Sequence, residues 1–151
     1  MPVKPVPEGY HTVTPYLIVH QGTEALAWYT KALDAKELMR FEVAGGKIGH
    51  AEFKLGDSIV MMADEAPEMG HRSPKSLGGA GVSLAIYVPD VDKAYARAIA
   101  AGGKEIKPLA NQFYGDRSGT FQDPFGHVWT IATHVEDVTP DEMKRRMKAM
   151  K

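Results

Sequence analysis

The sequence predicts an α+β protein built from two successive β-α-β-β-β modules and a C-terminal helix. Two observations carry this prediction. In each half of the chain, strand-like segments and one amphipathic helical segment follow each other in the same order. In addition, residues 35–38 after the first helical segment match residues 103–106 after the second, and this spacing of about 68 residues indicates one supersecondary unit used twice.

The first module is expected to cover residues 12–64. Its helical segment places Leu26, Tyr29 and Leu33 on one face, at three- and four-residue spacing. Its last strand is apolar on both faces, so we expect that strand to lie inside the sheet. The expected elements are a strand at 13–19, a helix at 24–33, and strands at 36–44, 47–55 and 58–63.

The second module is expected to cover residues 82–135, after a glycine- and proline-rich linker or functional loop at 65–81. Asp90 is expected to cap its helix. Pro108 predicts that the following strand is an edge strand or contains a bulge, because proline has no backbone N–H. The expected elements are strands at 82–88, 105–114, 119–123 and 128–133, a helix at 91–101, and the C-terminal helix at 139–150.

The composition excludes several classes of partner. The formal net charge of −1 gives no field that would attract nucleic acid or an anionic membrane. No segment has the roughly 18 to 20 consecutive apolar residues of a membrane helix. The chain has no cysteine, which excludes thiol chemistry and disulfides and fits a reducing compartment. We therefore expect a cytoplasmic protein whose partner is a small molecule.

Four short motifs give the chain a family resemblance: Gly49-His50-Ala51-Glu52, Gly56-Asp57-Ser58, Gly115-Asp116-Arg117 and Asp123-Pro124-Phe125-Gly126. Together with the tandem modules, these motifs resemble the vicinal oxygen chelate superfamily of glyoxalases, bleomycin-resistance proteins and extradiol dioxygenases, in particular its PhnB-like branch. The resemblance covers residues 12–135. It implies that each module curls a mixed sheet into a half-cup, that two half-cups enclose one site, and that residues 1–151 form a single domain.

Metal-dependent members of this superfamily carry a His, Gln or Glu on the first and fourth strand of each module. The corresponding positions in this sequence are Thr14, Met61, Ser83 and Thr130. Hydroxyl and thioether groups bind divalent cations too weakly for a resting site. The comparison with the family therefore predicts neither a metal centre nor another cofactor.

His50 and Glu52 are the candidate catalytic residues. They lie two residues apart on one predicted strand, so their side chains share a face. This pair either binds a ligand or acts as acid and base, or else it lies on a solvated outer face. A two-residue turn at Gly45-Gly46 would place Phe41 beside His50 and Met39 beside Glu52, whereas a three-residue loop would change that pairing.

Arg117 follows a Gly-Asp turn and is a candidate for binding a carboxylate or phosphate of the ligand. The alternative is an interaction of Arg117 with Asp116 in the turn, or a salt bridge at the rim of the cup. Ligand pockets combine aromatic surface with a few hydrogen-bonding groups. The other candidate ligand-binding residues are Gln112, Phe113 and Tyr114 in the second module, and Phe41 and Tyr16 in the first.

The leading hypothesis is a glyoxalase/bleomycin-resistance-like protein that binds a small organic ligand in the cup without a metal, as a homodimer. The alternative is a glyoxalase-like lyase or isomerase, or another small-molecule enzyme, that uses His50 and Glu52 with or without a divalent metal. The sequence does not decide between them, so it leaves open whether the protein is an enzyme.

Overall fold

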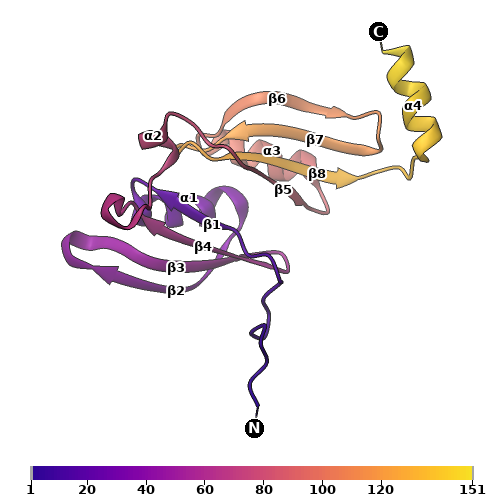
Figure 1. Ribbon diagram of the computed structural model, residues 1–151. Coiled ribbons are helices and arrows are strands. Elements are labelled where there is room, and N and C mark those ends of the chain that lie inside the picture. The colour runs from indigo at the N-terminus through magenta and orange to yellow at the C-terminus, as the bar shows by residue number, and fades with distance from the viewer. Residues whose placement is uncertain (1, 151) are drawn as a thin grey trace. The chain divides into compact units, whose positions relative to one another are not determined.

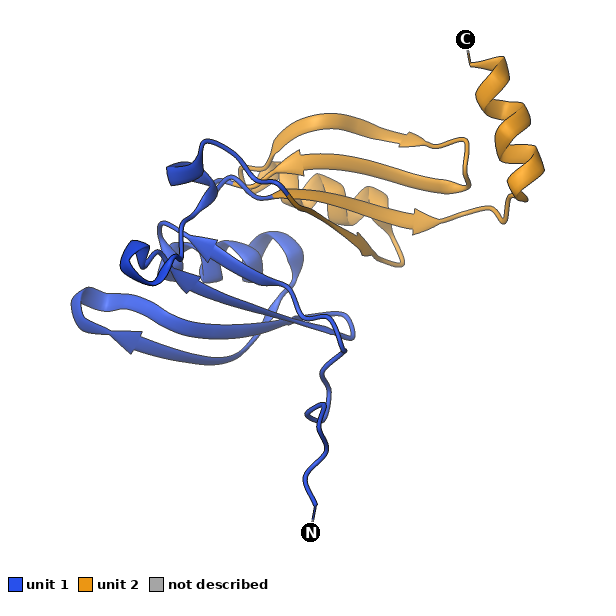
Figure 2. Cartoon of the chain, viewed as in Figure 1, with its two compact units in different colours: residues 1–81, 124–127 blue, residues 82–123, 128–151 orange. Residues whose placement is uncertain are grey.

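The computed structural model describes residues 2–150 and divides into two compact units (Figure 2). Unit 1 runs to Gly81 and also includes Pro124–His127. Unit 2 comprises Val82–Asp123 and the chain from Val128 onward. The boundary at Val82 coincides with the expected start of the second module. Within residues 2–150, no helix has the length and apolar character needed to cross a membrane.

Unit 1 is a four-stranded mixed sheet with a helix on one face (Figure 1). The strand order is β1-β4-β3-β2, in which β1 runs parallel to β4 and the other pairs are antiparallel. The expected central position of β4 is confirmed. The elements are β1 (Tyr16–Val19), α1 (Gly22–Leu33), β2 (Lys36–Val43), β3 (Lys47–Leu55) and β4 (Ser58–Asp64).

Unit 2 repeats this arrangement with the strand order β5-β8-β7-β6. The α+β class with two β-α-β-β-β modules is thereby confirmed. β6 is an edge strand, and its pairing with β7 is irregular between Lys107 and Ala110, as Pro108 predicts. Asp90 caps its helix by accepting from the backbone N–H of Lys93. The elements are β5 (Ser83–Tyr87), α3 (Val91–Ala100), β6 (Lys104–Asn111), β7 (Asp116–Gln122) and β8 (Val128–His134).

Each unit has its own core between the helix and the sheet. In unit 1 the Tyr29 ring of α1 stacks on the Phe53 ring of β3 with centroids 5.1 Å apart. In unit 2 the Tyr95 ring of α3 meets Phe121 of β7 edge to face. Because successive side chains of a strand point to opposite faces, Phe53 and Phe121 show which residues face the helix. We call the other face of each sheet its open face.

The β2–β3 hairpin differs from the predicted two-residue turn. Its loop has three residues, Ala44–Gly46, and pairs Val43 with Lys47. A bulge at Gly49 then adds one residue to β3, so that Phe41 pairs with His50 as the shorter turn also predicted. A Cβ on Gly49 would lie 2.7 Å from Val43 Cγ1, so this position favours glycine.

Residues 65–81, expected as a linker or functional loop, belong to unit 1 and contain a short helix, α2 (Pro74–Leu77), and hydrogen bonds to the carboxylate of Glu65. Glu65 accepts hydrogen bonds from the Ser73 backbone N–H at 2.8 Å and its hydroxyl at 2.5 Å, and from the Ser76 hydroxyl. These hydrogen bonds, led by the Ser73 hydroxyl, lower the pKa of Glu65 to about 2. The segment is therefore held by its own polar contacts.

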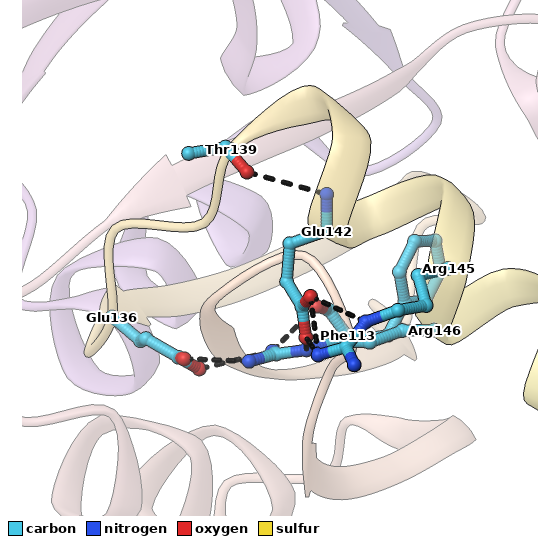
Figure 3. A network of polar contacts seen from close by, with 6 residues as sticks. All are labelled: Phe113, Glu136, Thr139, Glu142, Arg145 and Arg146. Atoms are coloured by element: carbon cyan, nitrogen blue, oxygen red, sulfur yellow. Dashed lines mark hydrogen bonds and ion pairs between the residues drawn. The ribbon is translucent and has the colours of Figure 1, made fainter.

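The C-terminal helix α4 (Pro140–Ala149) is attached to unit 2 through Arg146 (Figure 3). The guanidinium donates to Glu136 at 2.7 Å, to Glu142 at 3.0 Å and to the carbonyl of Phe113 at 3.0 Å. Thr139 caps the helix by accepting from the backbone N–H of Glu142, as the sequence predicts. The anchor is therefore a set of charged hydrogen bonds, since no residue of α4 is buried.

Candidate functional site

Six side chains share the open face of unit 1, because the strand register places them in two neighbouring rows. We call them the open-face cluster. They are Met39, Glu52, Met61 and Tyr16 in one row, and Phe41 and His50 in the next.

The open-face cluster combines exposed apolar side chains with a buried carboxylate. Tyr16 is 44% exposed, Met39 40% and Phe41 61%, whereas Glu52 is only 5% exposed. Exposed aromatic surface around a few convergent polar groups is typical of small-molecule sites. The structure thus brings together His50, Glu52, Phe41 and Tyr16, all of which were candidate site residues.

Glu52 is the centre of a hydrogen-bonded network. Its Oε2 atom lies 2.7 Å from Nε2 of His50, and Nδ1 of His50 lies 2.8 Å from the hydroxyl of Tyr16. Tyr10, in the N-terminal arm, donates its hydroxyl to Oε1 of Glu52. The hypothesis that His50 and Glu52 merely lie on a solvated face does not fit these contacts.

The network keeps Glu52 ionised despite its burial. Burial raises the pKa of Glu52, while the hydrogen bonds from His50 and Tyr10 lower it, and the net pKa lies below its usual value. The pKa of Tyr10 is raised, chiefly by its hydrogen bond to Glu52. Burial, together with the Glu52 charge, raises the pKa of Tyr16. At neutral pH the site therefore contains one carboxylate and two protonated phenols.

Arg117 lies on the α3 side of its sheet, not on the open face. Period-two alternation along β7 puts Arg117 on the same face as Phe121, which packs on α3. Its guanidinium donates to Asp92 at 2.8 Å and to Asn111 at 3.2 Å. The salt-bridge alternative accounts for these contacts, although its partner is Asp92. The proposed ligand-binding role of Arg117 stays a prediction that the geometry disfavours.

Gln112, Phe113 and Tyr114 lie in the turn between β6 and β7. The Gln112 side chain donates to the carbonyl of Ala110 at 3.3 Å, and the Phe113 and Tyr114 rings meet edge to face at 5.2 Å. The carbonyl of Phe113 receives Arg146 of α4. These candidates therefore take part in the turn and in the attachment of the helix, on unit 2, and the structure does not group them with Arg117.

A second polar cluster, which the sequence reasoning missed, lies on unit 2. Asp116 of β7 accepts from the Tyr87 hydroxyl at 2.7 Å and lies 2.8 Å from Nδ1 of His134. Nε2 of His134 lies 2.7 Å from Asp137. Both hydrogen bonds raise the pKa of His134. The antiparallel register of β7 and β8 pairs Asp116 with His134, so a prediction of that register from the sequence would have found this cluster.

The residues at the family's metal positions do not fit a divalent cation. In the structure, the residue of the first strand that pairs with the fourth-strand position lies two residues after Thr14 in unit 1 and two residues after Ser83 in unit 2. Thioether, phenol and hydroxyl groups are poor ligands for such ions, and among residues 2–150 no three His, Asp or Glu side chains are grouped so as to hold a metal. The paired positions are Tyr16 with Met61, and Ala85 with Thr130.

Known proteins resemble this chain in sequence and in fold. It is 39% identical over 140 residues to the uncharacterized protein Mb0911c of Mycobacterium bovis, a match that covers 91% of this chain and 92% of the relative. The crystal structure of TioX from Micromonospora sp. ML1 matches with a TM-score of 0.65 and 25% identity, over 83% of this chain and 99% of TioX.

A further structure, that of protein PA1353 from Pseudomonas aeruginosa, matches with a TM-score of 0.63 and 26% identity, over 83% of this chain and 99% of PA1353. The family model described as Glyoxalase/Bleomycin resistance protein/Dioxygenase superfamily matches residues 10–131. Because that match spans most of the chain and includes both sheets, the chain belongs to the glyoxalase/bleomycin resistance protein/dioxygenase superfamily, the vicinal oxygen chelate proteins.

Proposed function

We propose that the protein binds a small organic molecule on the open-face cluster of unit 1, without a resident metal. The observation that carries this proposal is the buried, hydrogen-bonded Glu52 carboxylate on the same sheet face as exposed Tyr16, Met39 and Phe41. The apolar side chains offer contact area to a ligand, and His50 offers polar recognition. Membership of a superfamily that includes bleomycin-resistance proteins supports this kind of function.

A fragment screen by ¹H–¹⁵N NMR tests the binding surface. We expect bound fragments to shift the amide signals of β2 and β3 around Phe41 and His50. Phe41→Ala is expected to weaken these fragments about tenfold, which corresponds to about 1.4 kcal/mol of lost aromatic contact. Ile106→Ala removes a similarly exposed apolar side chain from the edge strand of unit 2 and serves as the matched control. Fragments whose affinity is unchanged by Phe41→Ala would contradict the proposal.

Elemental analysis tests the metal-free part of the proposal separately. We expect the purified protein to contain no stoichiometric nickel, zinc, iron or manganese, because the donor set at the family's metal positions is poor. A full equivalent of any of these metals, lost when Met61 or Thr130 is substituted, would overturn this part.

The second candidate function is a metal-free acid–base enzyme. The observation that favours it is the 2.7 Å contact between Nε2 of His50 and Glu52, since a carboxylate that orients an imidazole is typical of catalytic bases. His50→Ala would then abolish turnover of a substrate. If the His50→Ala variant binds fragments and also keeps turnover, His50 is excluded as the base.

The finer classification is also a proposal. A PhnB-like protein that forms a homodimer in the cytoplasm fits the motifs and the superfamily. Light scattering checks the dimer and cell fractionation checks the location. A monomer at micromolar concentration would remove the dimer from this proposal.

A further inference from the structure

The hydroxyl group of Tyr16 has a different kind of hydrogen-bond partner from those of Tyr10, Tyr87 and Tyr95. Tyr10, Tyr87 and Tyr95 each donate to a carboxylate, at Glu52, Asp116 and Glu105 respectively. The hydroxyl of Tyr16 meets an imidazole nitrogen of His50 at 2.8 Å. An imidazole nitrogen with a free lone pair takes up a proton near neutral pH far more readily than a carboxylate does.

For a neutral imidazole at His50, the hydrogen-bond partners determine which ring nitrogen carries the hydrogen. Ionised Glu52 only accepts, so Nε2 of His50 must carry its hydrogen and donate. A neutral imidazole then has its lone pair on Nδ1, and this nitrogen accepts from the Tyr16 hydroxyl. In this arrangement Tyr16 donates to His50, and His50 donates to Glu52. We call these three residues the relay.

On the basis of the binding surface proposed above, we propose that Tyr16 is a nucleophile for acyl groups, with His50 as its general base and Glu52 as the positioning residue. A nucleophile within hydrogen-bond reach of a base, which a third group orients, is the arrangement that covalent catalysis uses. The ligand class is a small molecule with an electrophilic ester carbonyl.

The step balances with the residues present. The Tyr16 oxygen forms a bond to the acyl carbon, and the bond from that carbon to the leaving-group oxygen breaks, so that the leaving group departs with the electron pair. The phenol proton moves to Nδ1 of His50. The resulting imidazolium donates from Nε2 to Glu52, whose negative charge stabilises it. The imidazolium passes this proton to the leaving-group oxygen or to solvent. In the second step, neutral His50 takes a proton from the attacking water and returns it to the Tyr16 oxygen as the acyl bond breaks, which releases the free acid and restores the phenol.

The raised pKa of Tyr16 is compatible with this step. It makes free phenolate scarce at neutral pH, so an unassisted phenol would react slowly. Transfer of the proton to His50 as the new bond forms removes the need for free phenolate. The high basicity of the oxygen then favours attack.

Acetylation by p-nitrophenyl acetate tests the proposal on the intact protein. We expect release of p-nitrophenolate and an acetyl group on Tyr16, located by peptide mass spectrometry. Tyr87 is the internal control, because it is 67% exposed against 44% for Tyr16 and its hydroxyl meets only a carboxylate. Access alone predicts faster acetylation of Tyr87, whereas the relay predicts faster acetylation of Tyr16.

Variants separate the roles within the relay. Tyr16→Phe should remove the acetyl group at position 16, and His50→Gln, which keeps a polar side chain, should slow it by about a hundredfold or more. For Glu52→Gln, ¹⁵N NMR of His50 should show loss of the Nε2–H tautomer together with slower acetylation. A merely structural role of Glu52 would leave that tautomer unchanged.

The outcomes also separate this inference from the proposed binding function. If fragments bind the open-face cluster and Tyr16 is acetylated no faster than Tyr87, the relay is wrong and the binding proposal stands. If Tyr16 is acetylated through His50 while fragments bind elsewhere, the relay stands and the binding surface is wrong.

Discussion

The two units have the same strand order but carry different chemistry on equivalent rows of their open faces. In unit 1, the row across the sheet contains Tyr16, Met61, Glu52 and Met39. In unit 2, the equivalent row contains Ala85, Thr130, Thr120 and Lys107. The second row has a hydrogen bond between two threonine hydroxyls at 2.8 Å, where the first has a buried carboxylate. The repeat therefore fixes the sheet and leaves each face free to differ.

The histidines of the two units show the same contrast. His50 lies between the hydroxyl of Tyr16, which can either donate or accept, and the carboxylate of Glu52. His134 lies between the carboxylates of Asp116 and Asp137, and both of its ring nitrogens must donate to satisfy them. A neutral ring donates only once, so this position favours the charged imidazolium. Similar residues thus form the proposed relay in unit 1 and, in unit 2, an ion pair of His134 with Asp116 and Asp137, which we call the ionic clamp.

The largest expected effect separates the two equivalent rows by stability. Glu52→Ala is expected to lower the free energy of unfolding by about 1–3 kcal/mol, because the hydrogen-bond donors of Tyr10 and His50 lose their acceptor. Thr120→Ala loses one neutral hydrogen bond, and we expect a loss of about 0.5–1.5 kcal/mol. Denaturant unfolding measures both. Glu52→Gln is the size-matched control, and a smaller loss for Glu52→Ala than for Thr120→Ala would contradict the difference between the rows.

The next largest expected effect is the dependence of stability on pH. Its sign should be opposite at Glu65 of unit 1 and at His134 of unit 2. Glu65 has a lowered pKa, so its stabilisation is present above the unfolded pKa of about 4.5 and is lost as the pH falls toward about 2. His134 has a raised pKa, so its stabilisation is present below about 6.5 and is lost as the pH rises through the higher folded value.

Melting temperatures of Glu65→Gln and His134→Gln across pH test these signs. The gap between wild type and Glu65→Gln should be widest near neutral pH and should close in acid. The gap for His134→Gln should be widest in mild acid and should narrow as the pH rises. A gap for His134→Gln that widens above neutral pH would show that His134 is not an ionic clamp.

Local patterns in the sequence predicted most of the fold. The helices α1, α3 and α4, the central position of β4 and the irregular edge strand β6 follow from spacing, apolar content and one proline, whereas the short helix α2 was not predicted. The turn of the first hairpin was predicted with two residues and has three. The pairing of Phe41 with His50 nevertheless holds, because the Gly49 bulge compensates for the extra loop residue.

The candidate site was only partly predictable, because its contacts join distant segments. Tyr10 reaches Glu52 from an irregular arm, where no periodic pattern indicates direction. Asp116 meets His134 only once the register of β7 and β8 is known. The position of Arg117 was predictable in principle, since its even spacing from Phe121 puts both residues on the helix side.

The smallest expected effect is that of Arg117→Ala, and it tests whether unit 2 contributes to ligand binding. The ion pair with Asp92 is exposed, and exposed ion pairs contribute little to stability. We expect little or no change in stability and no change in the affinity of fragments that bind the open-face cluster. Asp92→Ala is the matched control, because it breaks the same ion pair without removing the guanidinium. A loss of fragment affinity in Arg117→Ala that Asp92→Ala does not reproduce would show that the guanidinium leaves Asp92 for the ligand, and would restore Arg117 as a binding residue.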